Sequence, residues 1–180
     1  MNRPVWKIPV FWIVWCGVLG LLTLFFFGLS TNPKQVPSPL IGKSAPDFVV
    51  QELSGVRKLQ LSQLQSSVVL NFWASWCPPC LAEMPNINQL YQDYADNDEV
   101  VFLMISVEDN FEKSKALVKR KGFDFQIYHV ESLNLPAIYK GTLPTTFLLS
   151  KDGKVLMQHE GMANYDNEQT RTLIKKALDD

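Results

Sequence analysis

Residues 68–85 read VVLNFWASWCPPCLAEMP, and this stretch decides the fold. Its first part, through Trp73, is apolar and rich in β-branched side chains, which is typical of a strand buried on both faces. Over 80–95, apolar side chains recur every three to four residues, as they do on one face of a helix. The sequence therefore predicts a buried strand, a turn that holds Cys77 and Cys80, and a helix.

Cys77 and Cys80 stand where this helix is expected to begin. Unpaired N–H groups and the positive end of the helix dipole stabilise a thiolate, so we expect the pKa of Cys77 to be lowered and Cys77 to be the nucleophile. Cys80 follows one helical turn later, and its sulfur can close a disulfide with the first. The predicted cycle is attack by Cys77 on a substrate disulfide, a mixed disulfide, and its resolution by Cys80.

Composition narrows the function of this cysteine pair. The chain has 180 residues with three cysteines and two histidines. A structural zinc site needs four ligands, and one CxxC without a second pair does not supply them. Lysine and arginine number 17 and aspartate and glutamate 18, which argues against nucleic-acid binding through phosphate contacts. Redox chemistry without a metal or other cofactor is the main use that remains for the pair.

The N-terminal part predicts a membrane anchor. Residues 8–29 carry no charged side chain, and a helix of that length is roughly 33 Å long, enough to cross a hydrocarbon core. Basic residues precede it, so the positive-inside rule predicts a cytoplasmic tail at 1–7 and the rest of the chain outside the cytoplasm. A proline-rich linker follows over 30–40, and then a folded domain over 41–180. The alternative is a cleaved signal peptide, whose apolar region would be shorter and would end in small residues.

The remaining pattern predicts an α/β domain. Strands alternate with helices, and the chain ends in a hairpin and a helix, which indicates a mixed sheet flanked by helices. An additional hairpin precedes the first buried strand. The expected elements are a hairpin within 46–65, strands over 67–73, 99–107, 125–130, 145–150 and 155–160, helices over 80–95, 110–121 and 166–178, and a short helix or loop over 132–140.

The cysteine-containing segment resembles the active site of thioredoxins. It is closer to the membrane-anchored TlpA/ResA-like branch, which includes the cytochrome c maturation thioredoxins. The similarity covers most of 40–178, including IGKSAPDF (41–48), GTLPTTFLL (141–149) and DGKV (152–155). This resemblance implies a thioredoxin-like fold with an added N-terminal β-hairpin, located outside the cytoplasm. It also implies reduction of particular protein disulfides, often on apocytochrome c, with electrons from a membrane thiol-disulfide relay.

Five further residues are expected to contact the substrate. Trp76, Pro78 and Pro79 flank the cysteines, and the two prolines fit the first helical turn, where a missing N–H costs nothing. Pro144 would be trans by the general preference of X-Pro bonds, but the resemblance implies a cis bond beside the CxxC. The backbone of Leu143 would then pair with a substrate strand.

Glu83 is the candidate proton acceptor. It follows Cys80 by three residues, on the same helix face. The residues alone leave two interpretations open: a surface acid favoured by the helix dipole, or a base that takes the Cys80 proton. The resemblance favours the second, because that branch keeps a functional glutamate here. Asn71 stands where ordinary thioredoxins have a buried aspartate, which leaves Glu83 as the nearest acid.

Three other functions share part of this pattern. An oxidase that forms disulfides has the same motifs, and only the redox potential separates it from a reductase. A copper(I)-delivery protein would use Cys77, Cys80 and a histidine, with His129 as the candidate, because copper(I) prefers thiolates. A peroxidase shares the APDF-like opening but carries its cysteine in a threonine-containing motif rather than WCPPC.

Overall fold

The computed structural model describes residues 10–30, 38–52, 57–130 and 135–179. The chain divides into two units, Met1–Val36 and Pro37–Asp180, and each is described by itself. The described part of the first unit is the helix α1 (Val10–Ser30), whose side chains over 12–26 are exposed. Within the described residues, none of the helices has the length and hydropathy that crossing a membrane requires. The tail predicted at 1–7 lies outside the described residues.

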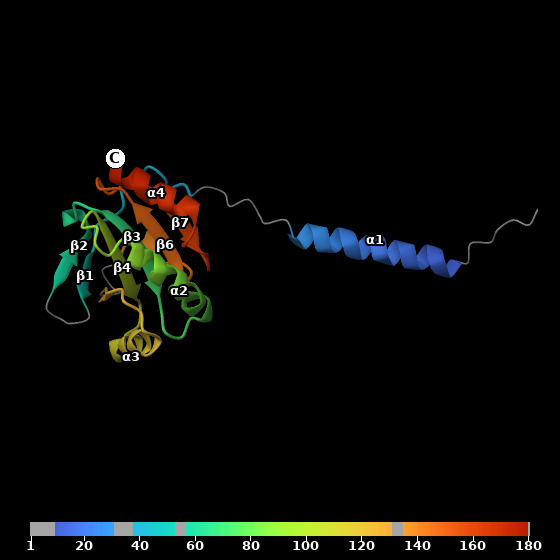
Figure 1. The fold of residues 1–180 in the computed structure, drawn as a ribbon, viewed down its shortest axis with the longest axis horizontal. Helices are drawn as coiled ribbons and strands as arrows, with labels where there is room; N and C mark the ends of the chain where they lie inside the picture. The colour runs from blue at the N-terminus through green and yellow to red at the C-terminus, as the bar shows by residue number, and fades with distance from the viewer. Residues whose placement is uncertain (1–9, 31–37, 53–56, 131–134, 180) are drawn as a thin grey trace, which may run out of the picture. The chain divides into compact units, whose positions relative to one another are not determined.

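The second unit is built on one mixed sheet of seven strands (Figure 1). Its strand order is β2-β1-β5-β4-β3-β6-β7. The central strands β3, β4 and β5 run parallel, whereas β6 pairs antiparallel with both β3 and β7. The strands are β1 (Val49–Glu52), β2 (Lys58–Gln60), β3 (Ser67–Trp73), β4 (Val100–Ser106), β5 (Ile127–His129), β6 (Thr145–Leu149) and β7 (Val155–Glu160).

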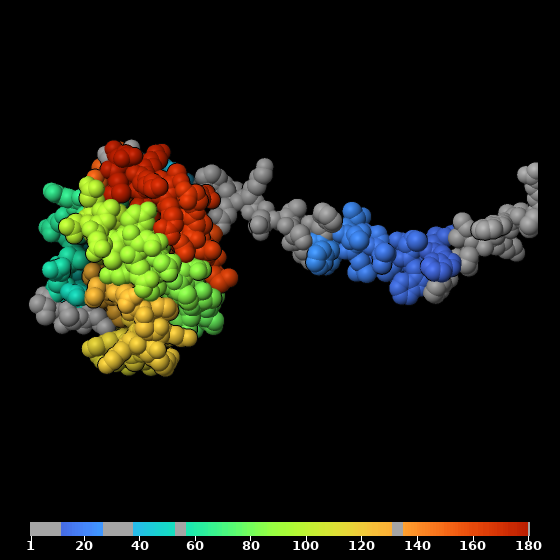
Figure 2. Space-filling model, viewed as in Figure 1, coloured from blue at the N-terminus to red at the C-terminus, as the bar shows by residue number. Residues whose placement is uncertain are grey.

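Helices cover one face of this sheet. They are α2 (Pro78–Asp93), α3 (Phe111–Lys121) and α4 (Glu168–Asp179), and Figures 1 and 2 show α2 between the other two. Their buried side chains, such as Met84, Leu117 and Ile174, join one apolar core. The other face carries a second core in which Phe48 of the N-terminal segment packs on Tyr139 of a short 3₁₀ helix, η3 (Ala137–Tyr139). Another 3₁₀ helix, η1 (Leu61–Gln63), follows β2.

The predicted elements agree with the observed ones to within two or three residues. The strands predicted over 67–73 and 155–160 have those bounds, and β3 is buried at all seven positions because cores lie on both of its faces. The helix predicted from position 80 begins at Pro78. Proline has its φ angle preset for a helix and lacks only an N–H that the first turn leaves unpaired, which explains the earlier start.

Capping residues set the ends of the other helices. The Asn110 side chain accepts a hydrogen bond from the Glu112 N–H at the start of α3, and Gly122 ends that helix with a φ of 69°. The last helix begins at Glu168, two residues later than predicted, because the Asn167 side chain accepts from the Thr170 N–H and caps it. The turn expected at Ser54-Gly55 and part of the segment 132–140 lie outside the described residues.

Candidate active site

The two cysteines form a disulfide at the start of α2. Their sulfurs are 2.12 Å apart and their Cα atoms 5.3 Å. Cys77 caps the helix, and its sulfur accepts a hydrogen bond from the Cys80 N–H at 3.3 Å. The predicted placement between a buried strand and a helix, with sulfurs close enough to bond, is therefore confirmed. The same N–H is available to stabilise negative charge on the Cys77 sulfur when the bond opens.

An open pocket lies against one of these cysteines. It has a volume of about 650 Å³, and its described lining includes Cys77 but not Cys80. Both cysteines are largely buried, and of the two it is Cys77 that borders this pocket. The lining is mainly apolar and consists of Trp76, Cys77, Pro78, Pro79, Val107, Leu135, Tyr139, Lys140, Gly141 and Leu143. Four of the five residues expected to contact the substrate are thus brought together.

The fifth residue, Pro144, follows a cis peptide bond. The Leu143-Pro144 bond is cis, as the resemblance implied. Strand β6 begins one residue later, at Thr145, and the hydroxyl of that threonine donates to the carbonyl of Thr142. Pro144 itself accepts a hydrogen bond from the Gly161 N–H through its carbonyl, at 2.8 Å. Along the chain, Leu143 thus lines the pocket two residues before β6 begins.

Glu83 is buried, with only 1% of its surface exposed. Its Oε1 accepts a hydrogen bond from Asn71 Nδ2 at 2.9 Å, and its Oε2 accepts from the Ala163 N–H at 3.1 Å. Burial raises the pKa of Glu83 to about 7, although both hydrogen bonds act in the opposite direction. The interpretation as a surface acid is therefore wrong. A carboxyl group that is partly protonated at neutral pH can both take and give a proton.

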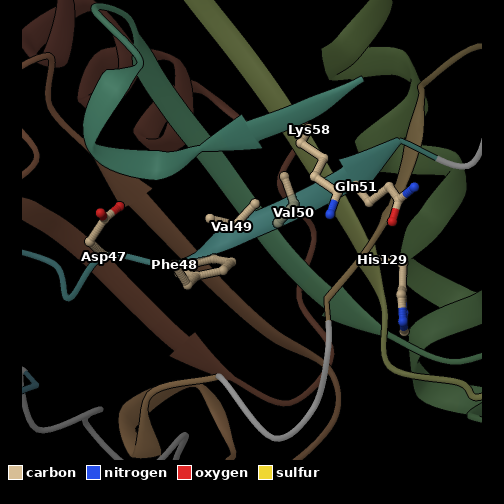
Figure 3. Close-up of a pocket in the computed structure, with 7 residues that line it drawn as sticks. All are labelled: Asp47, Phe48, Val49, Val50, Gln51, Lys58 and His129. Carbon is tan, nitrogen blue, oxygen red and sulfur yellow. The ribbon is translucent and has the colours of Figure 1, made fainter. Parts of the chain in front are cut away.

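His129 lies in a different pocket from Cys77. This second pocket has a volume of about 540 Å³ and runs along β1 beside Gln51 and Lys58 (Figure 3). The His129 ring packs edge-on against Phe111, with ring centroids 3.8 Å apart. In the described ranges, no three histidine, cysteine, aspartate or glutamate side chains are grouped to hold a metal ion. The arrangement offers copper(I) no combined site of Cys77, Cys80 and His129.

Comparison with known proteins agrees with this geometry. A family model described as Redoxin matches residues 40–174, most of the chain. The chain belongs to the redoxin family. A thiol-disulfide oxidoreductase ResA from a strain of Bacillus cereus is 34% identical over 179 residues, which cover 98% of this redoxin and 95% of the relative. A protein of the same name from Bacillus anthracis is 38% identical over 177 residues, covering 97% and 96%.

Solved structures give the same fold. A thiol-disulfide oxidoreductase from Bacteroides fragilis NCTC 9343 is 28% identical, with a TM-score of 0.61, and the match covers 76% of this redoxin and 100% of that chain. StoA from Bacillus subtilis, at 24% identity and a TM-score of 0.59, covers 75% and 98% and shows the fold alone. This redoxin is thus a TlpA/ResA-like thioredoxin-family protein and a thiol-disulfide oxidoreductase.

Glu108 lies beside this redoxin's site and was not predicted from the sequence. Its carboxylate is buried and accepts hydrogen bonds from the Ser75 N–H at 2.9 Å, from the Ser75 hydroxyl at 2.7 Å and from the Ser114 hydroxyl. Burial opposes ionisation, but these bonds prevail and lower the pKa of Glu108. The carboxylate thereby ties the loop before Cys77 to the end of β4. Glu108 follows β4, which is parallel to β3, and the carboxyl ends of parallel strands are where α/β folds place functional side chains. This position is the signal that could have revealed it.

We expect Glu108→Ala to destabilise the redoxin by about 2–3 kcal/mol, because buried donors of Ser75 and Ser114 lose their acceptor. Urea unfolding at pH 7 measures this. The contribution is present above the usual carboxyl pKa and is lost as acid protonates Glu108, so the difference should shrink at low pH. Glu112→Ala, an exposed acid on α3, serves as the control and should change stability by no more than about 0.5 kcal/mol. Equal effects of the two substitutions would contradict the assigned role.

Proposed function

We propose that this protein reduces disulfides of specific proteins outside the cytoplasm, as a membrane-tethered dithiol that needs no cofactor. One observation carries the proposal: Glu83, a buried acid with a pKa near 7, lies one helical turn beyond Cys80, while Cys77 faces the open pocket. This arrangement provides one sulfur that a partner can reach and a proton acceptor for the other. It suits a protein that must form a mixed disulfide and then resolve it.

The proposed reaction begins with the reduced protein. The Cys77 thiolate attacks one sulfur of the substrate disulfide, the substrate S–S bond breaks, and its second sulfur leaves as a thiolate. The Cys80 thiol then transfers its proton to Glu83 and attacks the Cys77 sulfur. The substrate's remaining sulfur leaves and takes up a proton. Two electrons have passed to the substrate, and the Cys77–Cys80 disulfide described here is the product.

Regeneration runs in the opposite direction. A dithiol of a membrane electron donor attacks the Cys77 sulfur from the pocket and expels Cys80 as a thiolate. Protonated Glu83 then returns its proton to Cys80. The second donor sulfur, as a thiolate, then attacks the donor sulfur that is bonded to Cys77, this mixed disulfide breaks, and Cys77 leaves as a thiolate. The donor ends as a disulfide and two electrons have passed to the Cys77–Cys80 pair. Glu83 thus serves as a base in one half-reaction and as an acid in the other.

Substrate contact is proposed for the pocket that Cys77 lines. An extended substrate segment would pair with the backbone at Leu143 beside cis-Pro144 and pack its apolar side chains against Trp76, which is 68% exposed. Among the described lining residues, Lys140 carries the one charge, which favours acidic side chains near the substrate cysteine. Apocytochrome c, a protein with a CxxC pair, is the substrate that the resemblance implies.

The tether is proposed for residues 8–29. The segment is uncharged, basic residues precede it, and α1 covers Val10–Ser30. The ResA relatives align over 97–98% of the chain, so their similarity includes this segment. A single anchor of this kind, with the linker at 30–40, would hold the domain 41–180 close to the outer face of the cytoplasmic membrane.

Fractionation checks the tether. We expect the full chain, expressed in bacterial cells, to stay in the membrane fraction after a carbonate wash, and a variant that lacks residues 8–29 to be released. An external protease should digest the domain in intact spheroplasts, because the positive-inside rule predicts its outward location. Release of the full chain by carbonate would contradict the anchor, and protection from the protease would contradict the orientation.

The redox potential tests the proposed direction of electron flow. The full chain in detergent is equilibrated with dithiothreitol and glutathione buffers, and the fraction of the Cys77–Cys80 disulfide is measured. A potential of about −270 mV or lower supports a reductase. A value near about −120 mV would instead support the oxidase. Reduction of disulfide-bonded apocytochrome c, compared with an unrelated disulfide protein such as insulin, then tests the substrate.

A further inference from the structure

Three polar residues form a row across the helix-covered face of the sheet. Asn71 on β3 is the register partner of Thr146 on β6, which in turn is the register partner of His159 on β7. Register partners of neighbouring strands point to the same face of a sheet. Asn71 and Thr146 are 1% and 0% exposed, respectively, so this polar pair is fully buried beside the apolar core. Such buried polar groups need an explanation.

The Asn71 amide uses its nitrogen twice. Nδ2 donates to Glu83 Oε1 at 2.9 Å and to Thr146 Oγ1 at 2.8 Å, which accounts for both hydrogens of a primary amide. The oxygen Oδ1 has no hydrogen-bond partner in the described part of the chain. A half-turn of the amide would present Oδ1 to the Glu83 carboxylate, where two negative oxygens repel each other. The orientation of this amide therefore decides whether ionised Glu83 is stabilised.

The Thr146 hydroxyl accepts the hydrogen bond from the Asn71 amide. A hydroxyl can accept or donate, and the location of its proton decides which. The Tyr165 hydroxyl finds no partner at standard distances among the described residues. Burial raises the pKa of Tyr165 and the neighbouring Thr146 hydroxyl acts in the opposite direction. Because Thr146 Oγ1 accepts from Asn71 Nδ2 at 2.8 Å, a lone pair of this oxygen faces Nδ2 rather than Oδ1.

We propose that Thr146 is a positioning residue that holds the Asn71 amide with its nitrogen toward Glu83. Thr146 acts through Asn71, and the role rests on the proposed use of Glu83 as the proton acceptor. Loss of the Thr146 hydroxyl frees the amide to turn, so that ionised Glu83 loses the hydrogen bond from Asn71 and keeps the one from the Ala163 N–H. Because a hydrogen bond to a charged group is worth roughly one pKa unit or more, the Glu83 titration should move upward by about one pH unit.

Other titratable groups face the same region. Helix α2 brings Cys77 and Cys80, which do not titrate while they are joined as a disulfide. The segment before α4 brings Tyr165, and β7 brings His159, whose ring lies 6.2 Å from that of Tyr165. The measurement must therefore report Glu83 itself, and it is repeated in a His159→Gln background.

The test is a carboxyl ¹³C NMR titration of the oxidised full chain labelled at glutamate, with the Glu83 signal assigned by its absence in Glu83→Gln. Thr146→Val, nearly equal in volume, should shift the midpoint upward by about one pH unit, and Thr146→Ser should restore the wild-type value. Thr170→Val removes another buried threonine hydroxyl from the same face and should leave the midpoint unchanged. In an Asn71→Leu background, Thr146→Val should have no further effect.

The outcomes separate this inference from the proposed function. An identical Glu83 midpoint in Thr146→Val and wild type overturns the inference, as does an equal shift in Thr170→Val. A shift that persists in the Asn71→Leu background also overturns it, because Thr146 would then act directly. If the shifts are as expected but Glu83→Gln reduces substrate at the wild-type rate, the positioning role stands and the proton-acceptor role of Glu83 fails.

Discussion

Cys77→Ser should abolish disulfide reduction, and Cys80→Ser should accumulate a mixed disulfide with the substrate. Cys77 lines the open pocket, so its sulfur is the one that a substrate disulfide reaches first. Without Cys80 the mixed disulfide cannot be resolved from within the protein. Incubation with an oxidised CxxC peptide, followed by non-reducing electrophoresis and mass spectrometry, measures the covalent adduct.

The matched control for this pair is Cys16→Ser, which removes the one cysteine outside the disulfide. It should retain wild-type turnover and form no adduct. The opposite assignment, in which Cys77→Ser traps the peptide and Cys80→Ser is inactive without an adduct, would show that Cys80 is the attacking sulfur. Serine is the better replacement at Cys77, because its oxygen preserves the helix cap that the Cys77 sulfur provides.

Glu83→Gln should lower the rate of mixed-disulfide resolution by about 10²- to 10³-fold at pH 8, the usual contribution of a positioned acid or base. In the wild type this rate should rise as pH increases through about 7, where Glu83 becomes ionised and able to accept the Cys80 proton. Regeneration by a dithiol donor should show the opposite trend, because it needs protonated Glu83. Stopped-flow measurement of both half-reactions between pH 5 and 9 checks the two slopes.

The control is Glu168→Gln, an exposed acid at the start of α4, which should keep both pH profiles. If Glu83→Gln keeps the wild-type slopes as well, another group takes the Cys80 proton. Glutamine can still accept the Ala163 N–H at the same position, so a loss of rate in this variant reports the loss of the titrating proton rather than of packing.

The pH dependence of the free energy of unfolding provides a second test of Glu83. The pKa of Glu83 is about 7 in the folded protein against a usual value of 4.5, so the folded state holds a proton that the unfolded state releases. Its contribution to the free energy of unfolding is full below pH 4.5 and is lost as pH rises through about 7, a change of up to about 3 kcal/mol. Urea unfolding at pH 5 and pH 8 should therefore show a larger loss for the wild type than for Glu83→Gln.

Local signals in the sequence predicted the architecture and the cysteine pair. The run through Trp73 is apolar at nearly every position because both faces of β3 are covered, and this pattern is visible without a structure. Gly122 marked the end of α3, and Asp152-Gly153 marked the turn between β6 and β7. Both glycines have positive φ angles, a conformation that favours residues without a side chain. The resemblance supplied the cis bond before Pro144, which general preferences would have assigned as trans.

The environment of the acids could not be predicted in the same way. Glu83 lies in the first turns of a helix, where an acid is normally exposed, and its burial depends on Ala163, which is 80 positions away along the chain. Glu108 follows β4 in a polar stretch and reads as loop surface, but Ser75 and Ser114 surround its carboxylate. Both cases depend on contacts between segments distant in sequence, which periodicity and spacing do not report.

Two stretches of chain and Val107 line the pocket beside Cys77. Trp76 to Pro79 supply one side together with the reactive sulfur, and residues between Leu135 and Leu143 supply much of the other. Glu83 and its partners Asn71 and Ala163 are not among the described residues that line this pocket. Under the proposed function, we therefore expect substitutions in 135–143 to change which proteins are reduced while proton transfer at Glu83 stays constant.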